Sequence, residues 1–206
     1  WNHPDLLWDA ENVVAVRVIE DVEPTAVAAF AARLGITTEL DPSIALALGA
    51  SGVRPIEMTN AYATFAAGGR WAPTHIVTRI EGPGGDVALP PLEEPRDVMT
   101  PAEAYVLTSM LTSVIESGTA TRARALRRPA AGKTGTSNDA CDAWFIGYTP
   151  RVVTGVWVGF DDRRPIGRNE TGGRAALPIW LEIMQAAHTG APLDFAMPSG
   201  VVSAVI

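Results

Sequence analysis

Hydrophobic residues recur every three to four positions in five stretches of the chain, which is the spacing of one face of a helix. Proline at the start and glycine just past the end frame several of these stretches, as is common at helix termini. The pattern predicts helices over residues 12–22, 24–34, 55–67, 101–117 and 178–188. We expect the apolar side of the third helix to include Ile56, Tyr62, Ala63 and Phe65, and that of the last helix Ile179, Trp180, Ile183 and Met184.

Alternating and β-branched stretches occupy most of the remaining chain. Residues 71–99 alternate loosely around the turn sequence Gly82-Pro83-Gly84-Gly85, which predicts a hairpin followed by a proline-rich linker. Three short strands then follow in series, one that carries residues 133–136 and two at residues 143–148 and 152–160, with close turns between them. They predict an antiparallel meander covered by helices, and therefore a single α+β unit over residues 1–206.

Composition removes several classes of function. A net charge of −7 argues against a nucleic-acid partner, which would normally face a basic surface. Cys141 is the only cysteine, so an internal disulfide is excluded. His3, His75 and His188 are far apart and form no His-Glu-x-x-His pattern, so the sequence predicts neither a metal site nor a cofactor.

The most informative stretch is Gly-Lys-Thr-Gly-Thr at residues 132–136. A nucleotide-phosphate loop would need glycine where Arg127 stands, and would open into a helix rather than a strand. On an edge strand, Lys133 and Thr134 to Thr136 would instead offer an ammonium, two hydroxyls and backbone N–H groups. Gly135 would let a ligand approach the backbone closely. These groups suit a carboxylate and a developing oxyanion.

The order of several motifs gives the chain a family resemblance. Lys-Thr-Gly is followed by Asp-Ala-Trp-Phe at 142–145, Gly-Val-Trp-Val-Gly-Phe-Asp-Asp at 155–162, Thr-Gly-Gly at 171–173 and Pro-Ile-Trp at 178–180. Together they resemble the second half of the transpeptidase domain of class A, bifunctional penicillin-binding proteins. The resemblance runs from about Asn12 to about Pro198, and implies the fold shared by these transpeptidases and the serine β-lactamases, with its N-terminal part missing.

The resemblance implies an acyl transfer in peptidoglycan cross-linking. A serine attacks the penultimate D-alanine carbonyl of a stem peptide, and an amine from a neighbouring strand accepts the acyl group. Lys133, Thr134, Gly135 and Thr136 are expected to hold the substrate carboxylate, or a β-lactam in the same place, with the Thr136 N–H in the oxyanion hole. Asn12 matches the asparagine of the Ser-x-Asn motif. A glycosyltransferase domain, an upstream membrane anchor and an extracytoplasmic location are also implied.

Two features depart from the family pattern. Ala10 stands where Ser-x-Asn has serine, and no serine of the chain has lysine three residues later, as the nucleophile motif Ser-x-x-Lys requires. We therefore expect the nucleophile to lie upstream and this chain alone to be inactive. Two alternatives remain at this point: a degenerate, non-catalytic scaffold of the same fold, or a serine β-lactamase.

Overall fold

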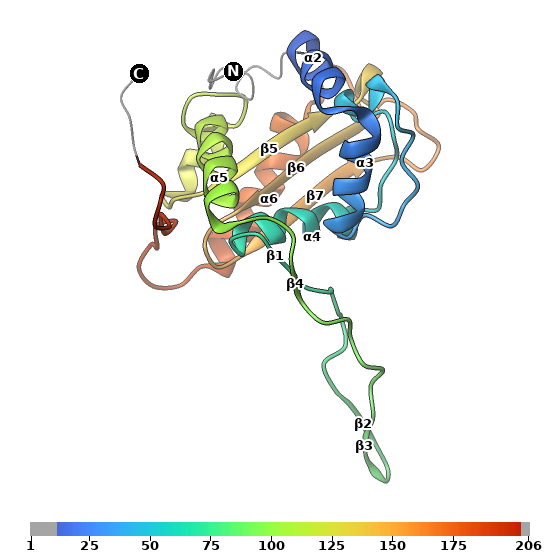
Figure 1. Cartoon of the computed structure of the whole chain (residues 1–206), viewed down its shortest axis with the longest axis vertical. Coiled ribbons are helices and arrows are strands. Elements are labelled where there is room, and N and C mark those ends of the chain that lie inside the picture. The colour runs from blue at the N-terminus through green and yellow to red at the C-terminus, as the bar shows by residue number, and fades with distance from the viewer. Residues whose placement is uncertain (1–11, 203–206) are drawn as a thin grey trace.

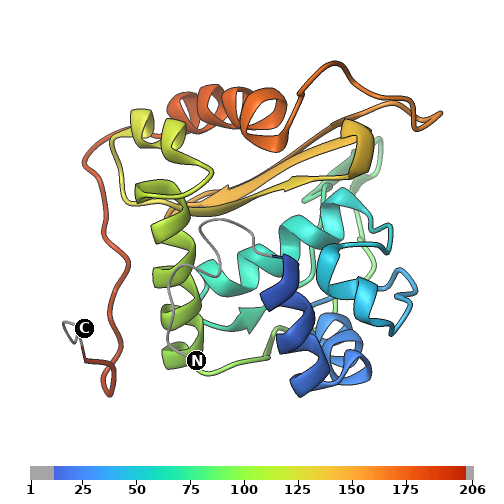
Figure 2. The same cartoon turned by 90° about the horizontal axis from the view of Figure 1, so that it is seen from above.

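A three-stranded antiparallel sheet lies between two layers of helices (Figure 2). The structure is a computed structural model that describes residues 12–202. The strands are β5 (Ala131–Thr136), β6 (Asp142–Tyr148) and β7 (Val153–Gly159), paired in that order. Helix α6 (Leu177–Ala187) covers one face, and helices α4 (Pro55–Ala66) and α5 (Pro101–Glu116) cover the other. The predicted α+β meander is confirmed.

The remaining helical segments surround this core. They are α2 (Asn12–Val22), α3 (Pro24–Arg33), and the short turns η1 (Ile44–Leu48), η2 (Thr121–Leu126), η3 (Asn138–Ala140) and η4 (Gly172–Ala176). Helix α3 packs beside α4 through a cluster that includes Leu34, Ile36, Ala61 and Trp71. Within residues 12–202, no helix has the length and apolar character that crossing a bilayer requires.

Proline fixes the start of three helices. Pro24, Pro55 and Pro101 open α3, α4 and α5, where a missing N–H costs nothing because the first turn has no acceptor for it. The sequence Thr100-Pro101-Ala102-Glu103 has the pattern of a capping box, and α5 begins with that capping box. The Thr100 N–H donates to the Glu103 carboxylate at 2.7 Å, and the Glu103 N–H donates to the Thr100 hydroxyl at 3.3 Å.

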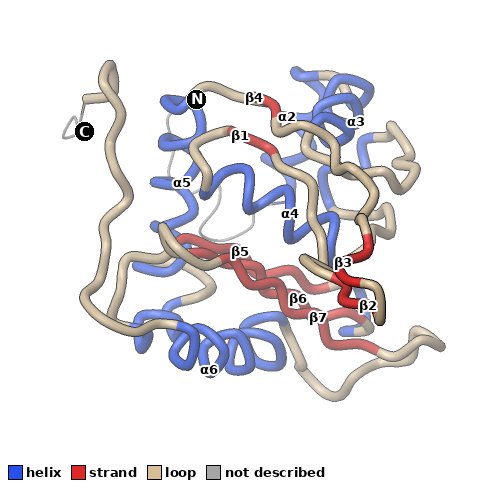
Figure 3. The backbone as a smooth tube through the Cα atoms, turned by 90° about the horizontal axis from the view of Figure 1, so that it is seen from below, coloured by secondary structure: helices blue, strands red, loops and turns tan. Residues whose placement is uncertain are grey.

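Residues 70–97 form an arm that projects from the body of the protein (Figure 1), and its short strands are drawn in red in Figure 3. Its tip is the predicted hairpin, made of β2 (Ile80–Gly82) and β3 (Gly85–Val87). Its base is a second antiparallel pair, β1 (Arg70–Trp71) with β4 (Arg96–Asp97). The sequence did not indicate this base pair, because two-residue strands far apart in the chain leave no periodic signal.

The core under α6 is built on Trp180. Its ring meets Phe145 edge-on at 4.9 Å between centroids, and its indole N–H donates to the Gly147 carbonyl at 3.2 Å. The expectation that Ile179 and Ile183 would join this core was wrong, since they are 45% and 44% exposed. Each lies about 100° around the helix from Trp180 or Met184, which face the sheet. Ile56 of α4 is likewise exposed rather than buried.

Glu57 ties the first turn of α4 to the loop after α3. Its carboxylate accepts hydrogen bonds from the hydroxyls of Thr37 at 2.6 Å and Thr38 at 2.8 Å. It also accepts one from the Arg54 guanidinium at 3.0 Å. Burial raises the pKa of Glu57, but the hydrogen bonds to its charged form outweigh that effect and lower the pKa to about 2.

We predict that Glu57→Gln lowers the free energy of unfolding at pH 7, by an amount on the order of 1 kcal/mol. The reason is that the hydrogen bonds that remain no longer have a charged acceptor. The folded-state pKa lies below the unfolded one, so the contribution of Glu57 is complete above about pH 4.5 and is lost as the pH falls towards 2. Urea titrations of the unaltered protein and the variant between pH 7 and pH 2 measure the free energy of unfolding of each. The difference between them should shrink across this window, and a constant difference would contradict the assignment.

Candidate functional site

Strand β5 carries the Lys-Thr-Gly-Thr sequence at one edge of the sheet. It pairs with β6 in a register that sets Lys133 opposite Ile146 and Gly135 opposite Trp144. Residues directly opposite each other share a face, and successive residues alternate between faces. Lys133 and Gly135 therefore lie on the face covered by α4 and α5, whereas Thr134 and Thr136 lie on the face of α6.

Lys133 is the only lysine of the chain, beside fifteen arginines. Its ammonium is half-buried and donates to the Thr134 carbonyl at 3.0 Å. Within the described residues it forms no ion pair with a carboxylate. Burial alone lowers the pKa of Lys133, because desolvation disfavours the charged form. The site therefore holds a partly desolvated cation that a ligand carboxylate would match.

The hydroxyls of Thr134 and Thr136 each contact a neighbouring loop. The Thr134 hydroxyl lies 2.9 Å from the hydroxyl of Thr119, which precedes η2. The Gly172 N–H, at the start of η4, donates to the Thr136 hydroxyl at 3.1 Å. Two loops that are distant in sequence thus meet β5 at neighbouring positions.

Glycine allows this contact between η4 and the strand. A side chain on Gly172 would clash with the Trp144 carbonyl and lie 2.6 Å from the Gly135 carbonyl. Because Gly172 is buried, a bulkier residue there would have to displace η4 from β5. The Thr-Gly-Gly sequence was noted for its family resemblance alone, and nothing in the sequence marked Thr119 as a neighbour of the site.

Asn12 is exposed and begins α2. No hydrogen bond between described residues joins Asn12 to Lys133. Ala10, which replaces the serine expected two positions earlier, lies outside the described residues. The structure therefore brings together Lys133, Thr134, Gly135 and Thr136, while the role of Asn12 stays a prediction.

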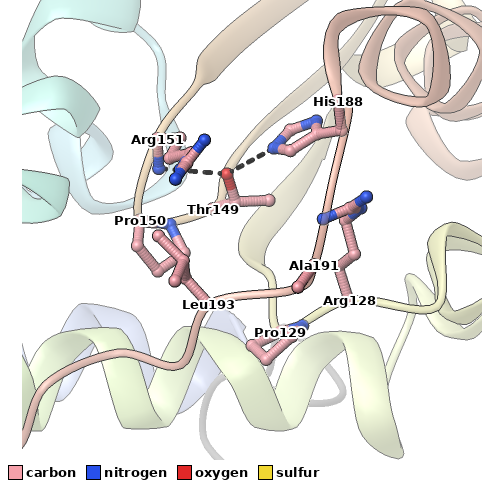
Figure 4. A pocket seen from close by; sticks show the side chains of 8 residues that line it. All are labelled: Arg128, Pro129, Thr149, Pro150, Arg151, His188, Ala191 and Leu193. Carbon is pink, nitrogen blue, oxygen red and sulfur yellow. Dashed lines mark hydrogen bonds between the residues drawn. The ribbon is translucent and has the colours of Figure 1, made fainter.

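A small pocket lies at the opposite end of β5 from Thr136 (Figure 4). The Thr149 hydroxyl accepts the Arg151 N–H at 3.2 Å and lies 2.8 Å from Nε2 of His188. These contacts fasten the turn between β6 and β7 to the end of α6. The side chain of Arg128 also lines the pocket, and donates to the Gly190 carbonyl at 2.7 Å. None of the residues predicted for the site lines this pocket.

Comparisons with known proteins place this geometry in a family context. Residues 32–185 match the penicillin binding protein transpeptidase domain family. Penicillin-binding protein 1A of Aquifex aeolicus is 38% identical over 188 residues, which cover 91% of this chain and 26% of that protein. The chain thus spans about a quarter of the length of the curated relatives it matches.

Solved structures are similar over most of the chain. The crystal structure of penicillin-binding protein 1A from Haemophilus influenzae has a TM-score of 0.87 and 28% identity, and the match covers 97% of this chain and 36% of that one. The PonA1 protein from Mycobacterium tuberculosis, in complex with penicillin V, has a TM-score of 0.71 and 27% identity. That match covers 86% of this chain and 54% of the other.

We predict that the amine of Lys133 titrates below the ordinary lysine pKa of about 10.4, because burial disfavours its charge. Since the chain has one lysine, the ¹³Cε resonance of ¹³C-lysine-labelled protein reports on this side chain without mutagenesis. The same titration in denaturing urea provides the control and should return the ordinary value. Equal midpoints in the folded and unfolded protein would show that Lys133 is solvated as a surface lysine.

Proposed function

Since this chain belongs to the penicillin-binding protein transpeptidase family, we propose that it is the carboxylate-binding half of a peptidoglycan-cross-linking D-alanyl-D-alanine transpeptidase of the class A type. The observation that carries the proposal is Lys133, a half-buried ammonium on an edge strand, whose neighbours Thr134 and Thr136 carry hydroxyls on the other face of the same strand. A carboxylate bound at this edge of the strand would form an ion pair with Lys133 and accept hydrogen bonds from the two hydroxyls.

The edge position of β5 supports binding of an extended peptide. An edge strand presents unpaired backbone N–H and C=O groups, to which a second extended chain can add. A stem peptide lying along β5 would place its terminal carboxylate against Lys133, Thr134 and Thr136. Gly135 supports this arrangement because its backbone has no side chain that would keep the peptide away.

The chemistry proposed for this site is a two-step acyl transfer. A serine hydroxyl attacks the penultimate D-alanine carbonyl, the peptide bond to the terminal D-alanine breaks, and that residue leaves with a proton on its nitrogen. An amine of a neighbouring stem peptide then attacks the ester, the bond to the serine oxygen breaks as the cross-link forms, and a proton of the amine passes to the serine oxygen. The Thr136 N–H would stabilise the oxyanion of each tetrahedral intermediate. Asn12 is proposed to contact the substrate amide.

The nucleophile and the anchor are proposed to lie outside this chain. None of its serines is followed by lysine at the spacing of Ser-x-x-Lys, and the chain spans about a quarter of its relatives. An upstream segment would then supply the serine and its lysine, a glycosyltransferase domain and a membrane anchor. The site would face the extracytoplasmic peptidoglycan, and β-lactams would occupy the place of the stem peptide.

Exposure to benzylpenicillin tests this proposal in the protein that contains the sequence preceding Trp1. We expect intact-mass and peptide-mass measurements to find one penicilloyl adduct, on a serine upstream of Trp1. A folded protein with no adduct would favour the non-catalytic scaffold. Rapid release of hydrolysed penicillin from the adduct would favour the β-lactamase alternative.

In the same protein, we predict that Lys133→Gln lowers the second-order acylation rate constant by about 10- to 100-fold. The reason is that a hydrogen bond to a charged group contributes about 1.5 to 3 kcal/mol. Arg151→Gln is the matched control, because it removes an exposed cation at the other end of β5. Its acylation rate should equal that of the unaltered protein. Equal losses in both variants would show that overall charge, and not the ammonium at residue 133, governs acylation.

A further inference from the structure

We propose that Thr119 is a positioning residue for the bound carboxylate, acting through Thr134. This inference rests on the proposed function. In this arrangement the Thr119 hydroxyl donates to Thr134, and Thr134 donates its own hydrogen to the ligand. The Gly172 N–H acts in the same way on Thr136. The two threonines of the strand thereby become a pair of aligned donors.

The argument begins with the hydrogen-bond capacity of a hydroxyl, which has one hydrogen to donate and two lone pairs to accept with. The Gly172 N–H can only donate, so the Thr136 oxygen is the acceptor in their 3.1 Å contact. The hydrogen of Thr136 remains available for another group. A carboxylate can only accept, and is therefore a suitable partner for it.

The same reasoning fixes the direction of the contact between the two threonine hydroxyls. Either oxygen can be the donor across the 2.9 Å between Thr119 and Thr134 while the site holds no ligand. Once Thr134 donates to a carboxylate, its hydrogen is committed, and it can only accept from Thr119. Donation by Thr119 then polarises the Thr134 hydroxyl, which strengthens its bond to the ligand.

Thr119 is held in place by its surroundings. The next residue, Ala120, is fully buried, and its N–H donates to the Val114 carbonyl at 3.1 Å. A side chain on Gly173 would come within 3.2 Å of the Thr119 carbonyl, so η4 lies directly against this loop. The loop before η2 and the start of η4 therefore lie against each other, and each contacts one of the two threonines of β5.

A purely structural role for Thr119 would affect every ligand alike, whereas a role in orienting Thr134 concerns the carboxylate. The test uses the longer protein and compares acylation by benzylpenicillin with acylation by its methyl ester. Thr119→Val keeps the shape of the side chain and removes the hydroxyl, and Thr119→Ser keeps the hydroxyl. Thr134→Val and the double variant complete a mutant cycle.

We expect Thr119→Val to lower the acylation rate constant for benzylpenicillin by about three- to ten-fold, the range of one hydrogen bond, and to leave the ester rate unchanged. Thr119→Ser should restore the rate for benzylpenicillin. In the Thr134→Val background, the Thr119→Val change should have no further effect, because its target is gone.

Equal losses for the acid and the ester would overturn the inference, as would a full additional loss in the Thr134→Val background. Failure of Thr119→Ser to restore the rate would also contradict it. These results leave the proposed function intact, since the unaltered protein still forms its adduct. Absence of any adduct in the unaltered protein is a different result, and would overturn both the proposed function and this inference.

Discussion

The contact between η4 and the first two strands of the sheet determines where the Lys-Thr-Gly-Thr strand lies. Gly172 is buried against the backbone of β5 and β6, with no room for a side chain. Five residues later the chain enters α6, whose Trp180 packs on Phe145 of the same sheet. The position of β5 is thus set on one face by a close backbone contact and a large aromatic core. Its outer edge pairs with no other strand in the described part of the chain.

In this arrangement the ammonium and the hydroxyls of the Lys-Thr-Gly-Thr strand lie on opposite faces of the sheet. Lys133 lies on the side of α4 and α5, where burial lowers its pKa. The hydroxyls of Thr134 and Thr136 lie on the other side, where they contact the Thr119 hydroxyl and the Gly172 N–H. In the proposed function, the cation and the two hydroxyl donors would act on one ligand at the edge of the strand, and each would be supported by a different part of the fold. Arginine would not be equivalent to lysine at position 133, since its planar guanidinium differs in shape from an ammonium and stays charged.

Much of this architecture could be predicted from local sequence. Proline and glycine at helix ends, the capping box of α5, the β-branched and aromatic residues of β6 and the close turns between the strands are signals carried by neighbouring residues, and the structure confirms them. Contacts between distant segments left no such signal: the β1–β4 pair, the Thr119–Thr134 bond and the approach of Gly172 to Gly135 depend on how the chain returns in three dimensions. The exposure of Ile179 and Ile183 was missed for a related reason, because periodicity shows that a helix is amphipathic without fixing the centre of its buried face.

The proposed binding of a ligand along the main chain of β5 would have an evolutionary consequence. Backbone N–H and C=O groups are the same for every residue except proline, so most substitutions along β5 leave that row of donors and acceptors intact. If the proposed function holds, escape from an inhibitor that imitates the substrate would have two routes. One is to change the few side chains proposed to touch the carboxylate, which the substrate would need as well, and the other is to shift the whole strand. The second route runs through the supports of β5, so replacements at residues such as 119 and 172 could alter inhibitor recognition without touching the inhibitor.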